Sequence, residues 1–322
     1  MLVYVIILNY KGKEDTVACV RSLFQMNALN FEVIIVDNCS PNDSVAYFQK
    51  HIPDIHVIET DTNLGYAGGN NVGIKYALKQ GADAVLILNN DTIVDQNFLN
   101  GFLDTSKKYP GAVLGARIYQ FGQNQLFQHF GGNWNNNKGK FINEPQKLID
   151  DRESWETIKP LDFVCGCALF VPVSVFQKVG LFEESFFLYY EEIDWCVRAQ
   201  KMGVPSLYCP FAVVWHKESA SLKNPRPPQS YFQWRNRIYF IERNFSKREL
   251  IYWIITKLIY RVFVLAVKKW MKDLQYFFLF IFFKEKLTEK LRINRLAYKA
   301  SLHGVKDYFF RQFGNGPKWI YQ

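Results

Sequence analysis

Residues 84–92 read AVLILNNDT, an unbroken apolar run that ends abruptly in two amides and a carboxylate. A short run that is apolar on every side is typical of a strand buried on both faces, and such strands occur in parallel sheets covered by helices. The sequence therefore predicts a central strand at residues 84–88, with Asn89, Asn90 and Asp91 at its carboxyl end.

Similar apolar runs precede this strand. Residues 2–8 and FEVIIVD at 31–37 read as buried strands, and IHVIE at 55–59 reads as a third. Segments with helical periodicity at residues 16–25 and 72–79 separate the runs. This alternation predicts an α/β fold with a parallel sheet and helices on each side.

Unusual polar clusters follow the strands: NYKG after the first, DNCS after the second and NNDT after the fourth. Ligands of open α/β sheets bind at the carboxyl ends of the strands, so this layout indicates a nucleotide-type ligand. Residues 61–71, rich in glycine and asparagine, read as a turn, and the run NLGYAGGNN at 63–71 precedes a helix, so it can approach a pyrophosphate. It lacks the spacing of a dinucleotide-binding motif, which disfavours a nicotinamide-dependent enzyme.

The second half of this body is less regular. Residues 120–160 are polar and predict an inserted hairpin with loops, and DFVCGCALFV at 162–171 resumes the sheet. A helix is expected from Glu191, capped by Gly203, and the strand FAVVWH ends at His216.

Charge divides the chain. The 322 residues carry a net charge of +9, but residues 1–216 have a net charge of −6 and residues 217–322 a net charge of +15. The proline-rich segment at 224–228 marks the division, so we expect a catalytic domain at 1–222 and a basic, aromatic helical region at 223–322. A basic tail indicates an anionic partner, either nucleic acid or a membrane surface.

The apolar residues of the tail favour the membrane over nucleic acid. LIYWIITKLIYRVFVLAVKKW at residues 250–270 is long enough to cross a bilayer, but Lys257 and Arg261 lie four residues apart on one helical face. The ten apolar residues at 274–283 are too few to cross. We therefore expect an interfacial amphipathic anchor; the alternative is a helical pair that packs on the body or on a second subunit, as a homo-oligomer.

Cysteine usage and the first residues bear on the compartment. The six cysteines are scattered, which predicts neither a disulfide framework nor a zinc site and favours a reducing compartment. MLVYVIILNY at the start reads as a buried strand and not as a signal peptide.

Two groups of side chains are candidates for chemistry. Asp91 is either the Asx-turn or cap of a helix near Asp95 or a ligand of a hard divalent cation, and His216 is either structural or a ligand. Glu191, Glu192 and Asp194 begin a helix, where acidic residues favour the helix dipole. Glu191 and Asp194 share a face, whereas Glu192 points away from them, which indicates a different role. A general base near an apolar wall can have a raised pKa, which suits proton abstraction at neutral pH.

Taken in order, eight stretches resemble the family 2 glycosyltransferases of the rhamnosyltransferase-like branch, and they cover most of residues 1–245. The stretches are VIILNYKG (5–12), VDNCSPNDS (36–44), NLGYAGGNNVGI (63–74), LILNNDT (86–92), VCGCALFVP (164–172), GLFEESFFLYYEEIDWCVRAQKMG (180–203), VVWHK (213–217) and RNRIYFIER (235–243).

The resemblance implies a GT-A fold, which is a Rossmann-like α/β fold with a mixed, mainly parallel sheet and flanking helices. It also implies Mn²⁺ or Mg²⁺ as cofactor, and inverting transfer from a nucleoside-diphosphate sugar to an acceptor hydroxyl. It makes Asp91 and His216 the metal ligands. The donor-binding residues that it implies are Asn9, Tyr10, Asp37, Asn63, Gly65, Gly69, Asn70, Asn89 and Asn90.

The catalytic residues implied by the resemblance are Glu191, Glu192 and Asp194, with Glu192 at the position of the base. Two departures matter. Asn89 stands where the DxD motif of the family has its first aspartate, and a glutamate stands where the base is an aspartate. The second departure leaves both Glu192 and Asp194 open as the base.

The branch implies rhamnose from dTDP-rhamnose as the sugar, and a glycan or polyprenyl-diphosphate-linked acceptor in cell-surface polysaccharide synthesis. The expected place is the cytoplasm, peripherally on the inner face of the cell membrane. Alternative donors are UDP-galactofuranose, UDP-glucose and UDP-N-acetylhexosamine, and a different class is a non-catalytic scaffold of a polysaccharide assembly complex.

Overall fold

The structure is a computed structural model that describes residues 1–128, 130–135, 140–144, 155–217, 226–282 and 286–321. The helices and strands are β1 (Val3–Asn9), α1 (Lys13–Leu23), β2 (Phe31–Asp37), α2 (Ser44–His51), β3 (His56–Glu59), α3 (Gly65–Lys79), β4 (Ala84–Asn89), β5 (Thr92–Val94), α4 (Phe98–Lys108), β6 (Val113–Gln120), β7 (Gln123–Phe127), β8 (Gly131–Asn135), β9 (Lys140–Glu144), β10 (Lys159–Leu161), β11 (Phe163–Val164), β12 (Ala168–Pro172), α5 (Val173–Val179), α6 (Glu191–Lys201), β13 (Ser206–His216), α7 (Pro227–Asn244), α8 (Lys247–Trp253), α9 (Ile259–Phe282) and α10 (Lys286–Phe309). Short 3₁₀ turns lie at Glu184–Phe186 and Lys318–Tyr321, and a π-helical turn at Ile254–Leu258 joins α8 to α9.

The chain forms two compact units. The first contains Met1–Glu184 and Glu191–Glu218, and the second contains Ser185–Tyr190 and Ser219–Gln322. The expected boundary at residues 222 and 223 lies outside the described residues. The sequence did not predict that the six residues Ser185–Tyr190 belong with the C-terminal unit.

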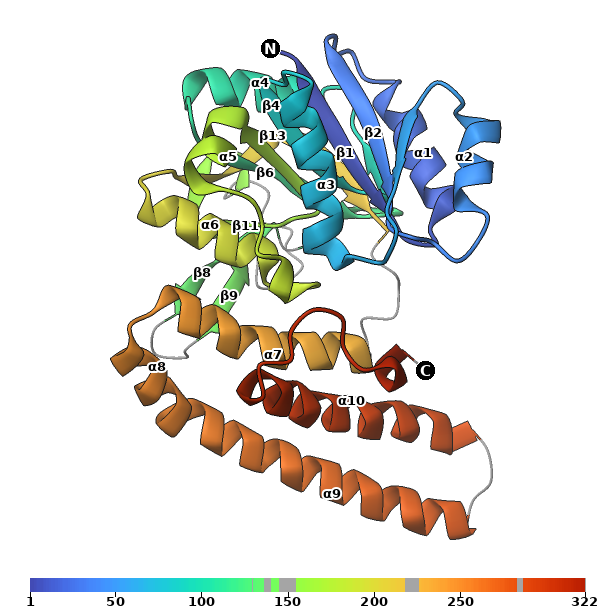
Figure 1. Ribbon diagram of the computed structural model, residues 1–322, viewed down its shortest axis with the longest axis vertical. Coiled ribbons are helices and arrows are strands. Elements are labelled where there is room, and N and C mark those ends of the chain that lie inside the picture. Colours follow the sequence, from blue (N-terminus) through green and yellow to red (C-terminus); the bar gives the residue numbers. More distant parts are fainter. Residues whose placement is uncertain (129, 136–139, 145–154, 218–225, 283–285, 322) are drawn as a thin grey trace. The chain divides into compact units, whose positions relative to one another are not determined.

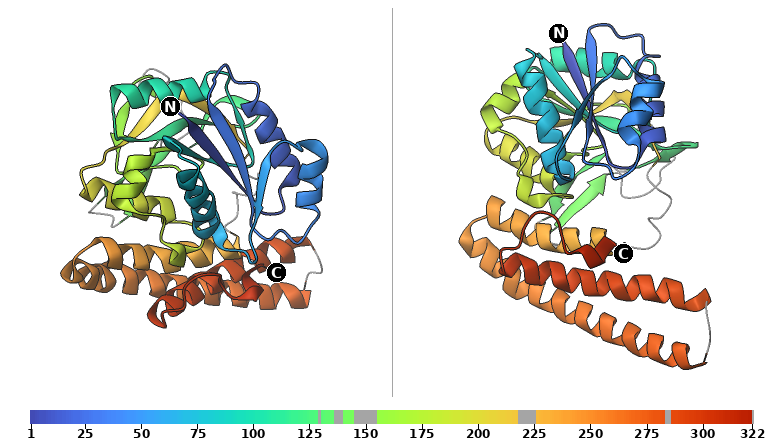
Figure 2. Two further views of the ribbon diagram at one scale, coloured as in Figure 1. Left: turned by 45° about the horizontal axis from the view of Figure 1, so that its top comes forward. Right: turned by 45° about the vertical axis from the view of Figure 1, so that its right-hand side comes forward.

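A twisted sheet forms the centre of the first unit (Figure 1). Among the described residues its strand order is β10-β13-β6-β12-β4-β1-β2-β3, with β5 paired to β13 and β7 to β6. β1, β2, β3 and β4 run parallel, and β6 shares their direction because β12 is antiparallel to both β4 and β6. α1 and α2 cover one face of the sheet and α3 the other (Figures 1 and 2), which confirms the α/β class.

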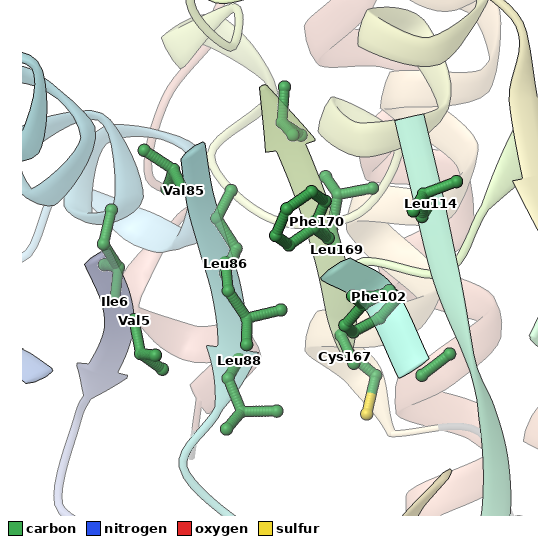
Figure 3. Packing of buried hydrophobic residues seen from close by; sticks show 14 of the residues in the cluster. Val5, Ile6, Val85, Leu86, Leu88, Phe102, Leu114, Cys167, Leu169 and Phe170 are labelled. Carbon is green, nitrogen blue, oxygen red and sulfur yellow. The ribbon is translucent and has the colours of Figure 1, made fainter. Parts of the chain in front are cut away.

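The strand that ends in NNDT is the centre of the core. β4 lies between β1 and β12, and its residues from Ala84 to Leu88 are buried. Leu86 pairs with Phe170 of β12, and Phe170 stacks on Phe102 of α4 at 5.4 Å between ring centroids. Figure 3 shows these side chains in the core together with Val5 and Ile6 of β1. Burial on both faces explains why this strand has no polar alternation.

The glycine-rich run is helical, which corrects the expected turn at residues 61–71. α3 begins at Gly65 instead of near Val72. A Cβ atom on Gly69 would lie 2.4 Å from Cδ1 of Leu8, and one on Gly73 would lie 2.5 Å from Cγ2 of Ile6. The glycines let α3 approach β1 closely, so this packing outweighs their low helix propensity.

The region after α4 is more ordered than the sequence indicated. β6 was not anticipated, and residues 120–160 include β7, β8 and β9 among the described residues. The strand expected at 162–171 is divided: β11 joins a small antiparallel sheet with β8 and β9, whereas β12 joins the central sheet. β13 ends at His216 as expected, and Gly203, after α6, has the positive φ of 76° that favours glycine.

The second unit is helical. α9 and α10 form a hairpin that also packs on α7 (Figures 1 and 2). The two apolar stretches of the tail belong to one helical run, of which Lys247–Phe278 is long and apolar enough to cross a membrane. Most of that segment is exposed, including the side chains of Phe263, Trp270 and Phe277.

Candidate active site

The carboxyl ends of the central strands bring the predicted polar residues together. β1 ends at Asn9, which pairs with Asp37 at the end of β2. On the other side of β1, Asn89 ends β4 opposite Leu8. β5 follows Asp91 and pairs antiparallel with β13, so that Thr92 lies opposite His216. Residues from four distant parts of the sequence therefore meet at one edge of the sheet.

Asp91 and His216 face each other at this edge. Oδ1 of Asp91 lies 3.0 Å from Nε2 of His216, and Nδ2 of Asn89 lies 3.4 Å from the same nitrogen. Burial acts to raise the pKa of Asp91, but the hydrogen bond and charge of His216 outweigh it and lower that pKa. Asp91 is thus held as a carboxylate, the form in which it can bind a cation.

Gln128 orients the imidazole and was missed by the sequence analysis. Its Oε1 lies 2.8 Å from Nδ1 of His216, and its Nε2 donates to the carbonyl oxygen of His216 at 3.2 Å. The second bond fixes which end of the amide faces the ring, so Nδ1 donates and Nε2 is directed at Asp91. A metal-binding histidine is commonly oriented in this way through its other nitrogen.

The donor set at Asp91 and His216 fits a hard divalent cation with open positions. The described residues contain no group of three or more histidine, cysteine, aspartate and glutamate side chains that could hold a metal ion. One carboxylate and one imidazole therefore leave several positions free. Mg²⁺ and similar ions are commonly bound in this way, with phosphate oxygens and water completing the shell.

Asp37 is held by a buried amide network. Asn9 is fully buried, and its Nδ2 donates to Oδ2 of Asp37 at 2.7 Å. The backbone N–H of Ser40 donates to the other oxygen, Oδ1, at 2.9 Å. Asn9 Oδ1 accepts from Thr16, and Nδ2 of Asn90 donates to Oγ1 of Thr16 at 3.0 Å. Asn9 therefore fixes the position of Asp37, and Asn90 supports Asn9 through Thr16. The neighbouring Tyr10 is 45% exposed.

A second amide, that of Asn38, holds the loop before α3, and the sequence analysis did not identify it either. Its Nδ2 donates to Oδ1 of Asn63 at 3.1 Å and to the carbonyl of Gly65 at 2.9 Å, and its Oδ1 accepts from the N–H of Leu64. Asn63 and Gly65 are therefore held next to the end of β2. The position of Asn38 directly after Asp37, within the DNCS cluster, is the signal that could have identified it from the sequence.

Asn70 lies inside α3. Its Nδ2 donates to the carbonyl of Tyr66 at 2.9 Å, and its buried Oδ1 has no partner among the described residues. Gly69 faces Leu8, and that close packing accounts for the glycine at this position.

The three carboxylates of α6 differ in their surroundings. Asp194 is fully buried, and its Oδ2 lies 2.9 Å from Nε of Arg198. Arg198 also donates to the carbonyls of Val179 and Leu181, so Asp194 ties α6 to the end of α5. Glu191 is only 4% exposed, and its Oε2 has no partner among the described residues.

Glu192 has the properties of a general base. Gly166 lies beneath it: a Cβ there would come 3.5 Å from Cβ and Cγ of Glu192, and the hydroxyl of Tyr66 donates to the Gly166 carbonyl. Oε2 of Glu192 is buried without a hydrogen-bond partner among the described residues. Burial raises the pKa of Glu192 to about 6, against the opposing effect of nearby backbone N–H groups.

The pKa of Glu191 is also raised, well above its ordinary value. Burial is the main cause, and the charge of Glu192 adds to it. Two adjacent carboxyl groups in an apolar setting disfavour the ionisation of one another. A carboxylate with a pKa close to neutrality is suited to accept a proton from a hydroxyl group.

The α/β fold and the polar side chains gathered at its strand ends agree with the family comparison. The model of glycosyl transferase family 2 matches residues 4–178, more than half of the chain, and the chain belongs to this family. The protein is therefore a glycosyltransferase. This confirms the family predicted from the eight sequence stretches.

Two relatives extend the comparison. The low-salt glycan biosynthesis hexosyltransferase of Haloferax volcanii is 27% identical over 316 residues, which are 94% of this chain and 91% of that protein. The N-acetylglucosaminyl-diphospho-decaprenol L-rhamnosyltransferase of Mycobacterium tuberculosis is 27% identical over 217 residues, 62% of this chain and 70% of that protein.

Solved structures confirm the GT-A fold. A mannosyltransferase from Pyrobaculum calidifontis, in complex with GDP-Man and Mn²⁺, matches with a TM-score of 0.56 at 11% identity, over 96% of this chain and 87% of that one. GalNAc-T7 with UDP, GalNAc and Mn²⁺ matches with a TM-score of 0.59 at 13% identity over 75% of this chain, which spans about half (48%) of that protein.

Proposed function

We propose that this glycosyltransferase moves a sugar, with inversion, from a nucleoside-diphosphate donor to a hydroxyl of a glycan or lipid-linked acceptor. The observation that carries the proposal is Glu192, a buried carboxyl with an unpartnered oxygen and a pKa of about 6 in the first turn of α6. A single base of this kind suffices for direct displacement at an anomeric carbon, since no second carboxyl group has to protonate the leaving diphosphate.

In the proposed reaction the acceptor oxygen bonds to the anomeric carbon while the bond from that carbon to the diphosphate breaks. The proton of the acceptor hydroxyl passes to the carboxylate of Glu192. Asp91 and His216 would hold a divalent cation, Mn²⁺ or Mg²⁺, which when bound stabilises the negative charge of the departing diphosphate. The 3.0 Å approach of these two side chains supports that role.

Asp37 would contact the nucleoside, in the position that Asn9 and Asn90 set for it. Tyr10, Asn63, Gly65, Gly69, Asn70 and Asn89 complete the proposed donor-binding residues. Glu191 would stand next to the base as a second carboxyl group of the first turn, and Asp194 would hold α6 in place by its ion pair with Arg198. The sequence left both Glu192 and Asp194 open as the base, and this proposal chooses Glu192.

Rhamnose from dTDP-rhamnose is the proposed donor. The names of the relatives support it: one is an L-rhamnosyltransferase acting on a decaprenol-diphosphate acceptor, and another is a dTDP-rhamnosyl transferase from Shigella flexneri, 23% identical over 284 residues. The hexosyltransferase relative keeps UDP-glucose, UDP-galactofuranose and UDP-N-acetylhexosamine as alternatives.

A lipid-linked acceptor would agree with the second unit. The exposed apolar side chains of α8 and α9, together with the net charge of +15 over residues 217–322, support peripheral attachment to an anionic membrane surface. We propose that the enzyme lies in the cytoplasm, peripherally on the inner face of the cell membrane.

The experiment is the release of nucleoside diphosphate from a panel of nucleotide sugars, with Mn²⁺ or with a chelator, in the presence of a polyprenyl-diphosphate-linked sugar. We expect metal-dependent release from dTDP-rhamnose that Asp91→Ala abolishes. Release from a different nucleotide sugar alone would contradict the choice of rhamnose. A protein that binds no donor at all would contradict the enzyme proposal and favour the scaffold.

A further inference from the structure

A short turn of the first unit, Cys165–Gly166–Cys167, links β11 to β12. The backbone N–H of Cys165 donates to the carbonyl of Phe130 at 3.0 Å. The carbonyl of Cys167 accepts from the N–H of Asn89, at the end of β4, at 2.9 Å. Both outer residues of the turn are therefore anchored by backbone bonds, and the middle residue, Gly166, is held by a side chain.

That side chain is Tyr66 of α3. Its hydroxyl donates to the carbonyl of Gly166 at 2.7 Å, across 100 positions of the sequence. The carbonyl of Tyr66 itself accepts from Nδ2 of Asn70 at 2.9 Å. Because Gly69 and Gly73 let the same helix approach β1 closely, Tyr66 is placed by an element that is packed firmly on the central sheet.

Gly166 lies between Tyr66 and Glu192. A Cβ atom on Gly166 would lie 3.1 Å from the hydroxyl oxygen of Tyr66 and 3.5 Å from Cβ and Cγ of Glu192. Burial raises the pKa of Glu192, and the backbone N–H of Gly166, which hydrogen-bonds to its carboxyl group, is one of the groups that lower it. Gly166 therefore offers its carbonyl to Tyr66 and its N–H to Glu192.

The phenol of Tyr66 keeps its proton. Burial raises the pKa of Tyr66 well above its ordinary value of 10.0, and the charges of Glu191 and Glu192 raise it further. The hydroxyl therefore stays a donor throughout the pH range in which Glu192 ionises. The other titratable groups that interact with this pair in the described part of the chain include Glu191, Cys165, Cys167 and Cys196, and burial raises the pKa of Cys196 to about 11.

We propose that Tyr66 is a positioning residue for Glu192: its hydroxyl holds Gly166 so that the N–H of Gly166 faces the carboxylate. The inference rests on the proposed role of Glu192 as the base. The effect of Tyr66 reaches the reaction through Gly166. Without the hydroxyl, Gly166 loses one of its two contacts and its N–H is free to turn away, so the ionised form of Glu192 loses a hydrogen bond that stabilises it.

The test is the pH profile of kcat/KM for Tyr66→Phe in the full chain, measured with the nucleotide sugar that the release assay selects. Phenylalanine keeps the ring and removes only the hydroxyl, and thermal unfolding shows that the variant is folded. We expect the acid limb to move about 1 pH unit higher, because the charged form loses a hydrogen bond. kcat/KM should then fall about tenfold at pH 5 and change little at pH 8.5.

Gly166→Ala tests the same contact from its other side. The added methyl group would lie 3.1 Å from the Tyr66 hydroxyl, so it should displace that hydroxyl and shift the profile in the same direction as Tyr66→Phe. The double variant should show no larger shift than the single variants, because both changes remove one contact. Shifts that add in the double variant would contradict the proposed link through Gly166.

Tyr208→Phe is the matched control, because Tyr208 of β13 is a fully buried tyrosine whose hydroxyl also donates to a backbone carbonyl, that of Trp155, at 3.1 Å. It should keep the midpoint of the wild-type profile. A Tyr66→Phe profile with an unshifted midpoint, including one lowered by the same factor at every pH, would overturn the positioning role alone. Wild-type kcat/KM in Glu192→Gln would overturn the proposed base and this inference with it, so the two failures are distinguishable.

Discussion

At the scale of single residues, two adjacent carboxyl groups receive different roles from their surroundings. Burial raises the pKa of Glu192 to about 6, and it raises that of Glu191, to which the charge of Glu192 also contributes, well above its ordinary value of 4.5. With a pKa of about 6, Glu192 is mostly ionised at neutral pH and able to accept a proton.

The raised pKa of Glu192 predicts an acid limb in the rate. Below pH 6 the base is protonated and inactive, so kcat/KM should rise with pH through about 6 and level off above it. The measurement is a pH profile of transfer at saturating Mn²⁺, with circular dichroism to show that the protein stays folded at pH 5. A rate that is constant from pH 5 to 8, or that falls with pH, would contradict a carboxylate base at this site.

Part of the site was predictable residue by residue. Asp91 and His216 are 125 positions apart, but both follow apolar strands, and the carboxyl ends of parallel strands meet at one edge. Gln128 was not predictable, because nothing in a polar segment indicates which of its amides will reach His216. For the same reason, the sequence could not predict that Nδ2 of Asn236, on α7, donates to the carbonyl of Phe186, 50 positions earlier in the chain.

At the scale of helices and strands, short apolar runs predicted the buried strands β2 and β4, whereas the glycine residues led to a wrong start for helix α3. β2 has the predicted bounds, Phe31–Asp37, because both of its ends are marked by a change from apolar to polar residues. α3 begins earlier than predicted because its glycines serve close packing on β1, which propensity alone does not reveal. Tertiary contact overrides local preference in that element.

Close packing through a glycine also predicts a stability effect in the second unit. A Cβ on Gly304 of α10 would lie 2.3 Å from the carbonyl oxygen of Tyr231 in α7, and a backbone atom cannot move aside like a side chain. We expect Gly304→Ala to destabilise the protein by about 1–3 kcal/mol, the range for overpacking. Chemical denaturation followed by tryptophan fluorescence measures it.

Ser301→Ala is a suitable control, since in the described part of the chain the hydroxyl of Ser301 donates within α10, to the carbonyl of Ala297 at 2.9 Å. Its effect should be smaller than that of Gly304→Ala. If the two variants unfold at the same denaturant concentration, the close crossing of α7 and α10 is not a determinant of stability.

At the scale of the whole molecule, charge and exposed apolar surface predict membrane attachment. Phe263, Trp270 and Phe277 are spaced seven residues apart, and their side chains are 65%, 63% and 60% exposed. We expect the triple variant with serine at these positions to bind vesicles of anionic lipid at least about tenfold more weakly, because each side chain contributes about 1.5–3 kcal/mol on burial. Sedimentation with the vesicles measures the binding.

Phe24→Ser is the matched control, because Phe24 is a 61% exposed aromatic residue in the first unit. It should sediment like the wild type, and both variants should retain transfer to a soluble acceptor. A triple variant that sediments like the wild type would exclude this face of α9 as the membrane contact and favour the alternative of a second subunit.

The central claim is that Glu192 is the base of a nucleotide-sugar transferase, and the direct test is Glu192→Gln. Two quantities are measured: the rate of transfer and the Kd of the donor by calorimetry with Mn²⁺. The predicted result is a rate at least about 10²-fold lower with an unchanged Kd, since the amide cannot accept the proton. Transfer at the wild-type rate would contradict the account, and a loss of turnover in Asp194→Asn alone would move the base to Asp194.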